Sequence, residues 1–139
     1  MIVLDSNVVS ELMRPNPAPA VRTWVRAHRD STIYTTAITL AEVGYGIERL
    51  PAGHRQDELS DAAAGIFKTF EGMVLPFDAG AAALYPSILV RRERAGLPTA
   101  RPDVQIAAIC RARQATLATR NIKDFEQTGV LLTDPWEHA

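Results

Sequence analysis

Four acidic residues occupy similar places relative to the strands and helices that the sequence pattern predicts. Asp5 directly follows an apolar run, and Asp124 comes soon after a later one. Glu42 and Asp103 lie in the first turns of helical segments. The four are separated by 37, 61 and 21 positions, so only a parallel sheet would bring them to one edge. Carboxylates grouped in this way suit Mg²⁺ or Mn²⁺, because these ions prefer oxygen ligands and offset the repulsion between like charges.

Each acid also has a purely structural interpretation. Asp5 can cap a helix, Asp124 can cap its own short helix, and Asp103 can stabilise a helix dipole behind Pro102. Glu42 is harder to explain in this way, since an unpaired carboxylate among apolar neighbours is costly. It needs a cation, a hydrogen-bond partner or an exposed cleft.

Two groups of basic residues could contact phosphate. The first group consists of Arg91, Arg92, Arg94 and Arg101. A solvated helix end explains these residues about as well as phosphate binding does. The second group is a loop rich in donors beside Asp124, and it is the better candidate for contacting an anionic substrate: Arg120, Asn121 and Lys123. Trp24 and Trp136 could stack on bases, although core packing and the chain end account for them at lower cost.

Strand-like and helical segments alternate along the whole chain. Apolar or β-branched runs predict strands at 2–4, 31–36, 73–77, 115–119 and 130–132. Helical spacing and capping residues predict helices directly after Asp5 and at 19–28, 38–50, 59–70, 78–94, 104–113 and 124–127. Pro86 should kink or break the fifth of these helices. The pattern predicts an α/β domain with a mostly parallel sheet of about four to five strands and helices on both faces.

Composition narrows the class of protein. The chain of 139 residues is close to the ~150 of a typical domain, which predicts one domain over 1–139. A net charge of −1 gives no general attraction to nucleic acid or membrane, so any nucleic-acid site must be local. The single cysteine, Cys110, excludes an internal disulfide. With no signal peptide in MIVLD and no apolar run of membrane-spanning length, we expect a soluble cytoplasmic protein that does not engage membranes.

The sequence resembles PIN-domain ribonucleases, specifically the VapC-type (FitB-like) toxins of bacterial toxin–antitoxin pairs. The resemblance covers essentially the whole chain, through the segments MIVLDSNVVSELMRP, TTAITLAEVGYGI, GLPTARPDVQIAAI, ATLATRNIKDF and TDPW.

This resemblance implies a site and partners. The matching metal-binding and catalytic acids are Asp5, Glu42, Asp103 and Asp124, gathered around Mg²⁺ or Mn²⁺. The positions implied to orient acids, water or phosphate are Asn7, Thr119, Arg120 and Asn121. The expected activity is metal-dependent hydrolysis of RNA phosphodiester bonds, and the expected partners are an RNA substrate, a cognate antitoxin and a second copy in a homodimer. Pro86 is unusual in this setting and could alter the dimer surface.

Other functions remain open at this level. A different Mg²⁺-dependent phosphoesterase could use Asp5 as nucleophile, although an aspartyl phosphatase usually has a second acid two residues later, where this chain has Asn7. A catalytically silent scaffold could use the same acidic pocket to bind an antitoxin or another partner, since an arginine satisfies carboxylates as a metal does. Neither alternative accounts for Glu42 and the segment from Thr119 to Asp124 together.

Overall fold

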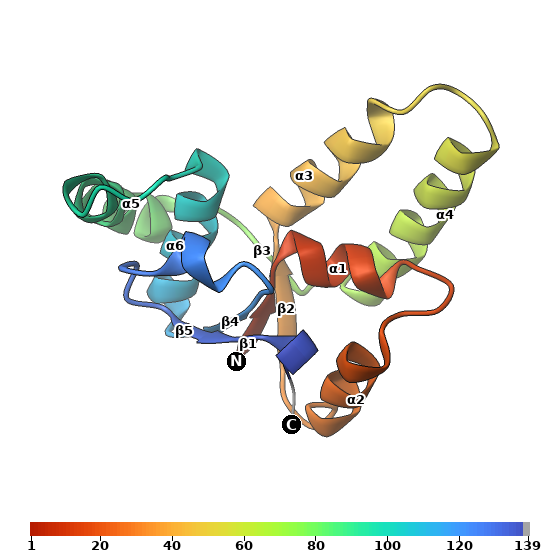
Figure 1. Cartoon of the computed structure of the whole chain (residues 1–139), viewed down its shortest axis with the longest axis horizontal. Helices are drawn as coiled ribbons and strands as arrows, with labels where there is room; N and C mark the ends of the chain where they lie inside the picture. The colour runs from red at the N-terminus through yellow and green to blue at the C-terminus, as the bar shows by residue number, and fades with distance from the viewer. Residues whose placement is uncertain (138–139) are drawn as a thin grey trace.

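The computed structural model describes residues 1–137, in which a five-stranded parallel sheet has helices on both faces (Figure 1). The strands are β1 (Ile2–Leu4), β2 (Ile33–Thr36), β3 (Val74–Leu75), β4 (Thr116–Ala118) and β5 (Leu131–Thr133). They lie side by side in the order β3-β2-β1-β4-β5, and each pairing is parallel. The predicted α/β fold is confirmed.

The described residues also form six α-helices and two 3-10 helices between and after the strands. They are α1 (Ser6–Leu12), α2 (Pro19–Ala27), α3 (Ala37–Glu48), α4 (His54–Thr69), α5 (Ala79–Arg94), α6 (Arg101–Arg113) and the 3-10 helices η1 (Ile122–Phe125) and η2 (Pro135–Glu137). No helix in this part of the chain is both long and apolar enough to cross a membrane.

Two hydrophobic cores lie on opposite faces of the sheet. Successive residues of a strand point to opposite faces, so Val3 and Leu117 join the core formed with α5 and α6. Their neighbours Leu4 and Ala118 join the core that includes Trp24 of α2 and Phe70. Because both faces are covered, the central strand β1 is apolar along its length rather than alternating.

The strand order reverses beside β1. The chain moves from β1 to β2 and β3 on one side, and β4 and β5 lie on the other. In open parallel sheets the crevice at the carboxyl ends of the strands on either side of such a reversal is the usual ligand site. Here those ends lead directly into Asp5 after β1 and Thr119 after β4.

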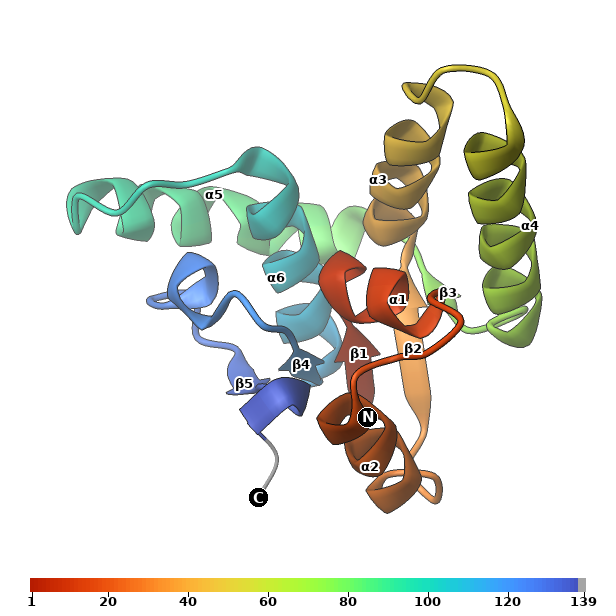
Figure 2. The same cartoon turned by 45° about the vertical axis from the view of Figure 1, so that its right-hand side comes forward.

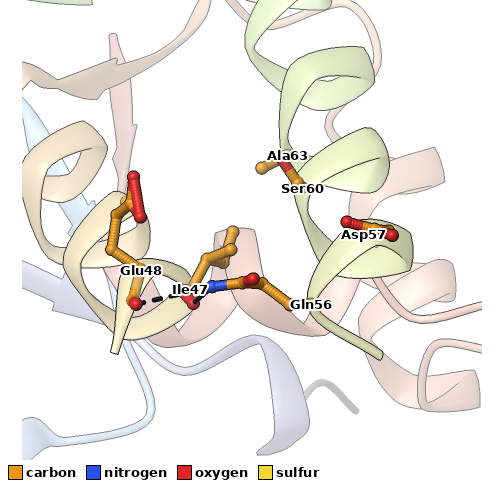
Figure 3. A pocket seen from close by; sticks show the side chains of 7 residues that line it. Ile47, Glu48, Gln56, Asp57, Ser60 and Ala63 are labelled. Carbon is orange, nitrogen blue, oxygen red and sulfur yellow. Dashed lines mark hydrogen bonds between the residues drawn. The ribbon is translucent and has the colours of Figure 1, made fainter. Parts of the chain in front are cut away.

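Helices α3 and α4 form a hairpin that projects from the sheet (Figure 2). Thr36 begins α3 as its N-cap, since its hydroxyl accepts a hydrogen bond of 3.1 Å from the Thr39 N–H. At the far end, Gln56 Nε2 donates to the carbonyls of Ile47 and Leu50, at 3.1 Å in each case. These bonds satisfy carbonyls at the end of α3 and connect it to α4 beside a pocket of about 380 Å³ (Figure 3).

Several predicted boundaries were wrong. Helix α5 runs without a break through Pro86, so of the kink or break expected there the break is wrong. Helix α6 begins at Arg101, one residue before the Pro102 that was expected to open it, and Pro102 lies in its first turn, where a missing N–H is tolerated. Asp124 does not cap a helix over 124–127, because it lies inside η1 and its own N–H donates to the Asn121 carbonyl at 3.0 Å.

Candidate active site

Asp5 lies at the centre of a hydrogen-bond network at the carboxyl end of β1. It is 3% exposed and is the N-cap of α1. Its Oδ1 accepts the Ser6 N–H at 2.8 Å, while its Oδ2 accepts the Thr119 hydroxyl at 2.8 Å and the Asn7 amide at 3.3 Å. The capping interpretation of Asp5 is therefore confirmed at Oδ1, while Oδ2 is held by Thr119 and Asn7.

The predicted orienting residues surround this carboxylate. Thr119 Oγ1 accepts hydrogen bonds from Asn7 Nδ2 at 3.2 Å and from the Asn121 N–H at 3.0 Å. Asn7 Oδ1 in turn accepts the Arg120 N–H at 3.2 Å. Since Asn7 donates its amide toward Asp5, it does not offer the second acid that an aspartyl phosphatase uses there.

Glu42 and Asp103 approach Asp5 from two further elements, α3 and α6. Burial raises the pKa of Glu42, and the nearby charge of Asp5 raises it further, while a hydrogen bond from Ser6 acts in the opposite direction. Burial, followed by the charges of Asp5, Asp124 and Glu42, raises the pKa of Asp103 to about 7. The four acids predicted from the sequence are thus close enough for their charges to interact.

Asp124 completes the group from η1, on the solvent side. It is exposed, whereas Asp5 is buried. Its charge raises the pKa of both Asp5 and Asp103, after burial as the larger cause in each case. The site therefore extends from Asp5, which is buried and fixed by hydrogen bonds, to Asp124, which is exposed to solvent.

The carboxylates are not arranged as a ready-made metal site. Within residues 1–137, no three aspartate, glutamate, histidine or cysteine side chains converge closely enough to hold a metal ion. Oε1 of Glu42 is buried and has no hydrogen-bond partner among the residues that the structure describes. A buried carboxylate oxygen without a donor is costly, so this atom is available to a cation or a water molecule. Carboxylate oxygens are suitable ligands for a divalent ion. The four side chains would have to move closer together to enclose one.

Arg92, a member of the first group of basic residues, is not available to bind phosphate. Its side chain is 1% exposed, and its guanidinium donates to Thr99 Oγ1 and to the backbone carbonyls of Pro98, Lys123 and Glu126. A guanidinium enclosed in this way cannot reach RNA. Arg92 instead connects α5 to the loop before α6 and to η1, and its charge lowers the pKa of Asp103.

Sequence reasoning missed one contact near the site. Cζ of Arg120 lies 4.8 Å from the centroid of the Trp136 ring, a cation–π geometry. Trp136 also packs against the core that contains Trp24, in line with the core packing expected of it near the chain end. The only signal in the sequence was the TDPW segment, which names no partner for the ring.

The fold and the site define a known class of protein. A family model described as the PIN domain matches residues 2–131, and the chain belongs to the PIN-domain family. Its relatives include the VapC ribonuclease Y4jK of Sinorhizobium fredii, which is 37% identical over 140 residues covering 100% of both chains. The Toxin FitB of Neisseria gonorrhoeae is 35% identical over 137 residues, covering 98% of this chain and 99% of the relative.

Solved structures give the same result. The crystal structure of FitAcB from Neisseria gonorrhoeae contains a chain that is 35% identical, with a TM-score of 0.88 and 99% of each chain covered. The resemblance to VapC and FitB toxins that the sequence motifs indicated is thereby confirmed.

Proposed function

We propose that this protein is a Mg²⁺- or Mn²⁺-dependent endoribonuclease and the toxin of a toxin–antitoxin pair. The observation that carries the proposal is the convergence of four acids from the end of β1, α3, α6 and η1, where burial and then the charges of Asp5, Asp124 and Glu42 raise the pKa of Asp103. Like charges held together without a cation destabilise a fold. A divalent ion bound by Asp5, Glu42, Asp103 and Asp124 would offset that repulsion. Membership of a family whose members include proteins named as VapC ribonucleases supports the RNA substrate.

The residues have separable roles in this mechanism. A bound divalent ion would supply a water of lowered pKa and would stabilise charge on the phosphodiester. Asp5, fixed by Ser6, Asn7 and Thr119, serves as the rigid ligand. Glu42, with one free buried oxygen, orients the attacking water or binds the ion. Asp124, being exposed, lies where substrate enters.

The partner of this site is an antitoxin. The relative named Toxin FitB is 35% identical, and a chain of the same identity was solved in structures described as FitAB and FitAcB. A basic side chain of the antitoxin would occupy the same carboxylates that hold the ion, because a guanidinium and a metal satisfy the same oxygens. Homodimerisation, which the resemblance implies, is part of this proposal.

The deciding experiment is cleavage of total cellular RNA by the purified protein with Mg²⁺, with Mn²⁺ and with EDTA. Asp5→Asn is the control, since the amide cannot supply the anionic ligand. Cutting that needs the metal and is absent from the variant supports the proposal. Undiminished cutting by Asp5→Asn contradicts the assigned site, and metal binding without cutting favours the silent scaffold that binds a partner.

A further inference from the structure

Arg120 combines a fixed position with an unneutralised charge. Its backbone N–H is held by Asn7, and its guanidinium lies over the ring of Trp136. None of the ion pairs found among residues 1–137 includes Arg120. A guanidinium has five N–H donors, and stacking on an aromatic face leaves its edges free to bind oxygen atoms.

The guanidinium borders a pocket beside the acidic site. This pocket has a volume of about 540 Å³ and is called here the Arg120 pocket. Its lining includes Arg120, Asn121, Lys123, Asp124, Glu126 and Asp134. Asp124 is shared with the acidic site, so the two are continuous. Asp134 is already engaged, because its Oδ1 accepts the Trp136 N–H at 2.9 Å.

We propose that Arg120 binds an RNA phosphate next to the one that is cleaved, and that Trp136 is the positioning residue that holds Arg120 for this contact. The inference rests on the proposed ribonuclease function and adds the direction in which RNA leaves the carboxylates, along η1 and η2. Arg120 is one residue beyond Thr119, whose hydroxyl binds Asp5. Because its pocket shares Asp124 with the acidic site, the Arg120 guanidinium is placed to bind a phosphate beside the reacting one.

Charge explains why this single arginine should matter. Acidic side chains outnumber the cations Arg120 and Lys123 around the pocket. The pocket therefore has no general attraction for RNA, as a basic surface would have. RNA binding here depends on the donors of Arg120 and Lys123. Trp136 removes rotational freedom from Arg120 before RNA arrives, so less entropy is lost when the phosphate binds.

Trp136 is itself anchored independently of the site. Its ring packs against the core that contains Trp24 of α2, and the Asp134 side chain fixes its backbone. Through Trp136, helix η2 thus holds the Arg120 guanidinium at a fixed place relative to the core. This arrangement requires both the aromatic face and the guanidinium, which makes it testable as a pair.

The test is a double-mutant cycle on RNA binding. A fluorescein-labelled single-stranded RNA is titrated in EDTA, to prevent cleavage, at several salt concentrations. Each phosphate contact to a single strand contributes about 0.7 to the slope of log affinity against log salt, or about fivefold in affinity at 0.1 M salt. Arg120→Ala should lower the slope by about 0.7, and Trp136→Leu should produce most of the same loss.

The cycle separates positioning from a merely structural effect. Trp136→Leu in the Arg120→Ala background should cause no further loss of RNA affinity, and Trp136→Phe should restore most of it. Arg49, whose Cζ lies 5.8 Å from the Tyr45 ring on α3, provides a matched cation–π pair that does not line the Arg120 pocket. Arg49→Ala and Tyr45→Leu should leave the slope within error of the wild type. Additive losses, or an equal effect of the Arg49 pair, would overturn the proposal.

Two further measurements distinguish this inference from the proposed function. The NMR shifts of the Arg120 side chain should move when Trp136 becomes leucine, with no RNA present, and unchanged shifts would reject the contact. In cleavage assays Arg120→Ala and Trp136→Leu should raise KM more than they lower kcat. If the wild type cleaves RNA but KM is unaffected, only the role of Arg120 fails. If the wild type neither cleaves nor binds RNA, the ribonuclease function fails with it.

Discussion

The Thr119 hydroxyl donates a hydrogen bond of 2.8 Å to Oδ2 of Asp5, although the two residues are 114 positions apart in the chain. Thr119 is buried, and its Oγ1 also accepts from Asn7 and Asn121. One hydroxyl thereby joins the carboxyl ends of β1 and β4 and fixes the carboxylate on which the proposed metal site depends.

Thr119→Val should lower RNA cleavage by about 10–100-fold, the usual effect of removing a group that orients a metal ligand. It should also reduce the free energy of unfolding by about 1.5–3 kcal/mol, because a bond to a charged group is lost. Cleavage rates and urea unfolding measure the two effects. Thr119→Ser keeps the hydroxyl and is the matched control; a loss equal to that of valine would show that the methyl group matters instead.

The stability of the metal-free protein should fall as pH rises through the range set by Asp103. The pKa of this group is raised from 3.8 to about 7 in the folded state. Between these values the unfolded chain releases the proton while the folded protein retains it, so the free energy of unfolding decreases with pH. Above about pH 7 both states are ionised and the penalty is complete.

Urea unfolding in EDTA at pH 5, 6, 7 and 8 measures this dependence. Asp103→Asn removes the titrating group and its charge near Asp5, so its stability should change less over the same range. At pH 8 the variant should be more stable than the wild type. An identical pH dependence in both proteins would contradict the raised pKa of Asp103.

Adding Mg²⁺ at pH 8 should raise the melting temperature of the wild type. A ligand bound only by the folded state stabilises it by about 2.7 kcal/mol when present at 100 times its Kd. Asp5→Asn should show little of this shift, since it lacks one anionic ligand. Na⁺ at equal ionic strength controls for simple screening of the acidic group, and an equal shift with Na⁺ would argue against a specific site.

Arg92→Met should destabilise the fold by about 3 kcal/mol, because three backbone carbonyls lose their charged donor at once. Arg91→Ala is the control on the same helix, since Arg91 is exposed and bonds only Gln127 among the described residues. Urea unfolding compares the two variants. A stable Arg92→Met protein would show that the enclosed guanidinium contributes little.

The Cys110 thiol should be unreactive in the native protein. It is buried, and burial together with the charge of Asp5 raises its pKa to about 12. The thiolate is the reactive species, so a disulfide reagent at pH 8 should label Cys110 slowly until urea unfolds the chain. Rapid labelling of the folded protein would indicate that α6 opens readily.

The amino-acid sequence by itself determined the alternation of strands and helices and the identity of the four acids. Apolar runs such as Ile2–Leu4 and capping residues such as Asp5 and Asp78 are local signals, because hydrogen bonding and side-chain periodicity act over a few residues. The same signals indicated a parallel sheet, and from it the common edge at which the acids meet.

Only the tertiary structure decided how those side chains are used. Arg92 and Arg120 are the same residue type in basic stretches of the sequence, yet one is enclosed by carbonyls and the other lies over Trp136 beside the site. Likewise, Pro86 does not break α5, contrary to its local preference. Burial, charge coupling and long-range hydrogen bonds depend on residues far apart in the chain, and these contacts exist only once the sheet has brought them together.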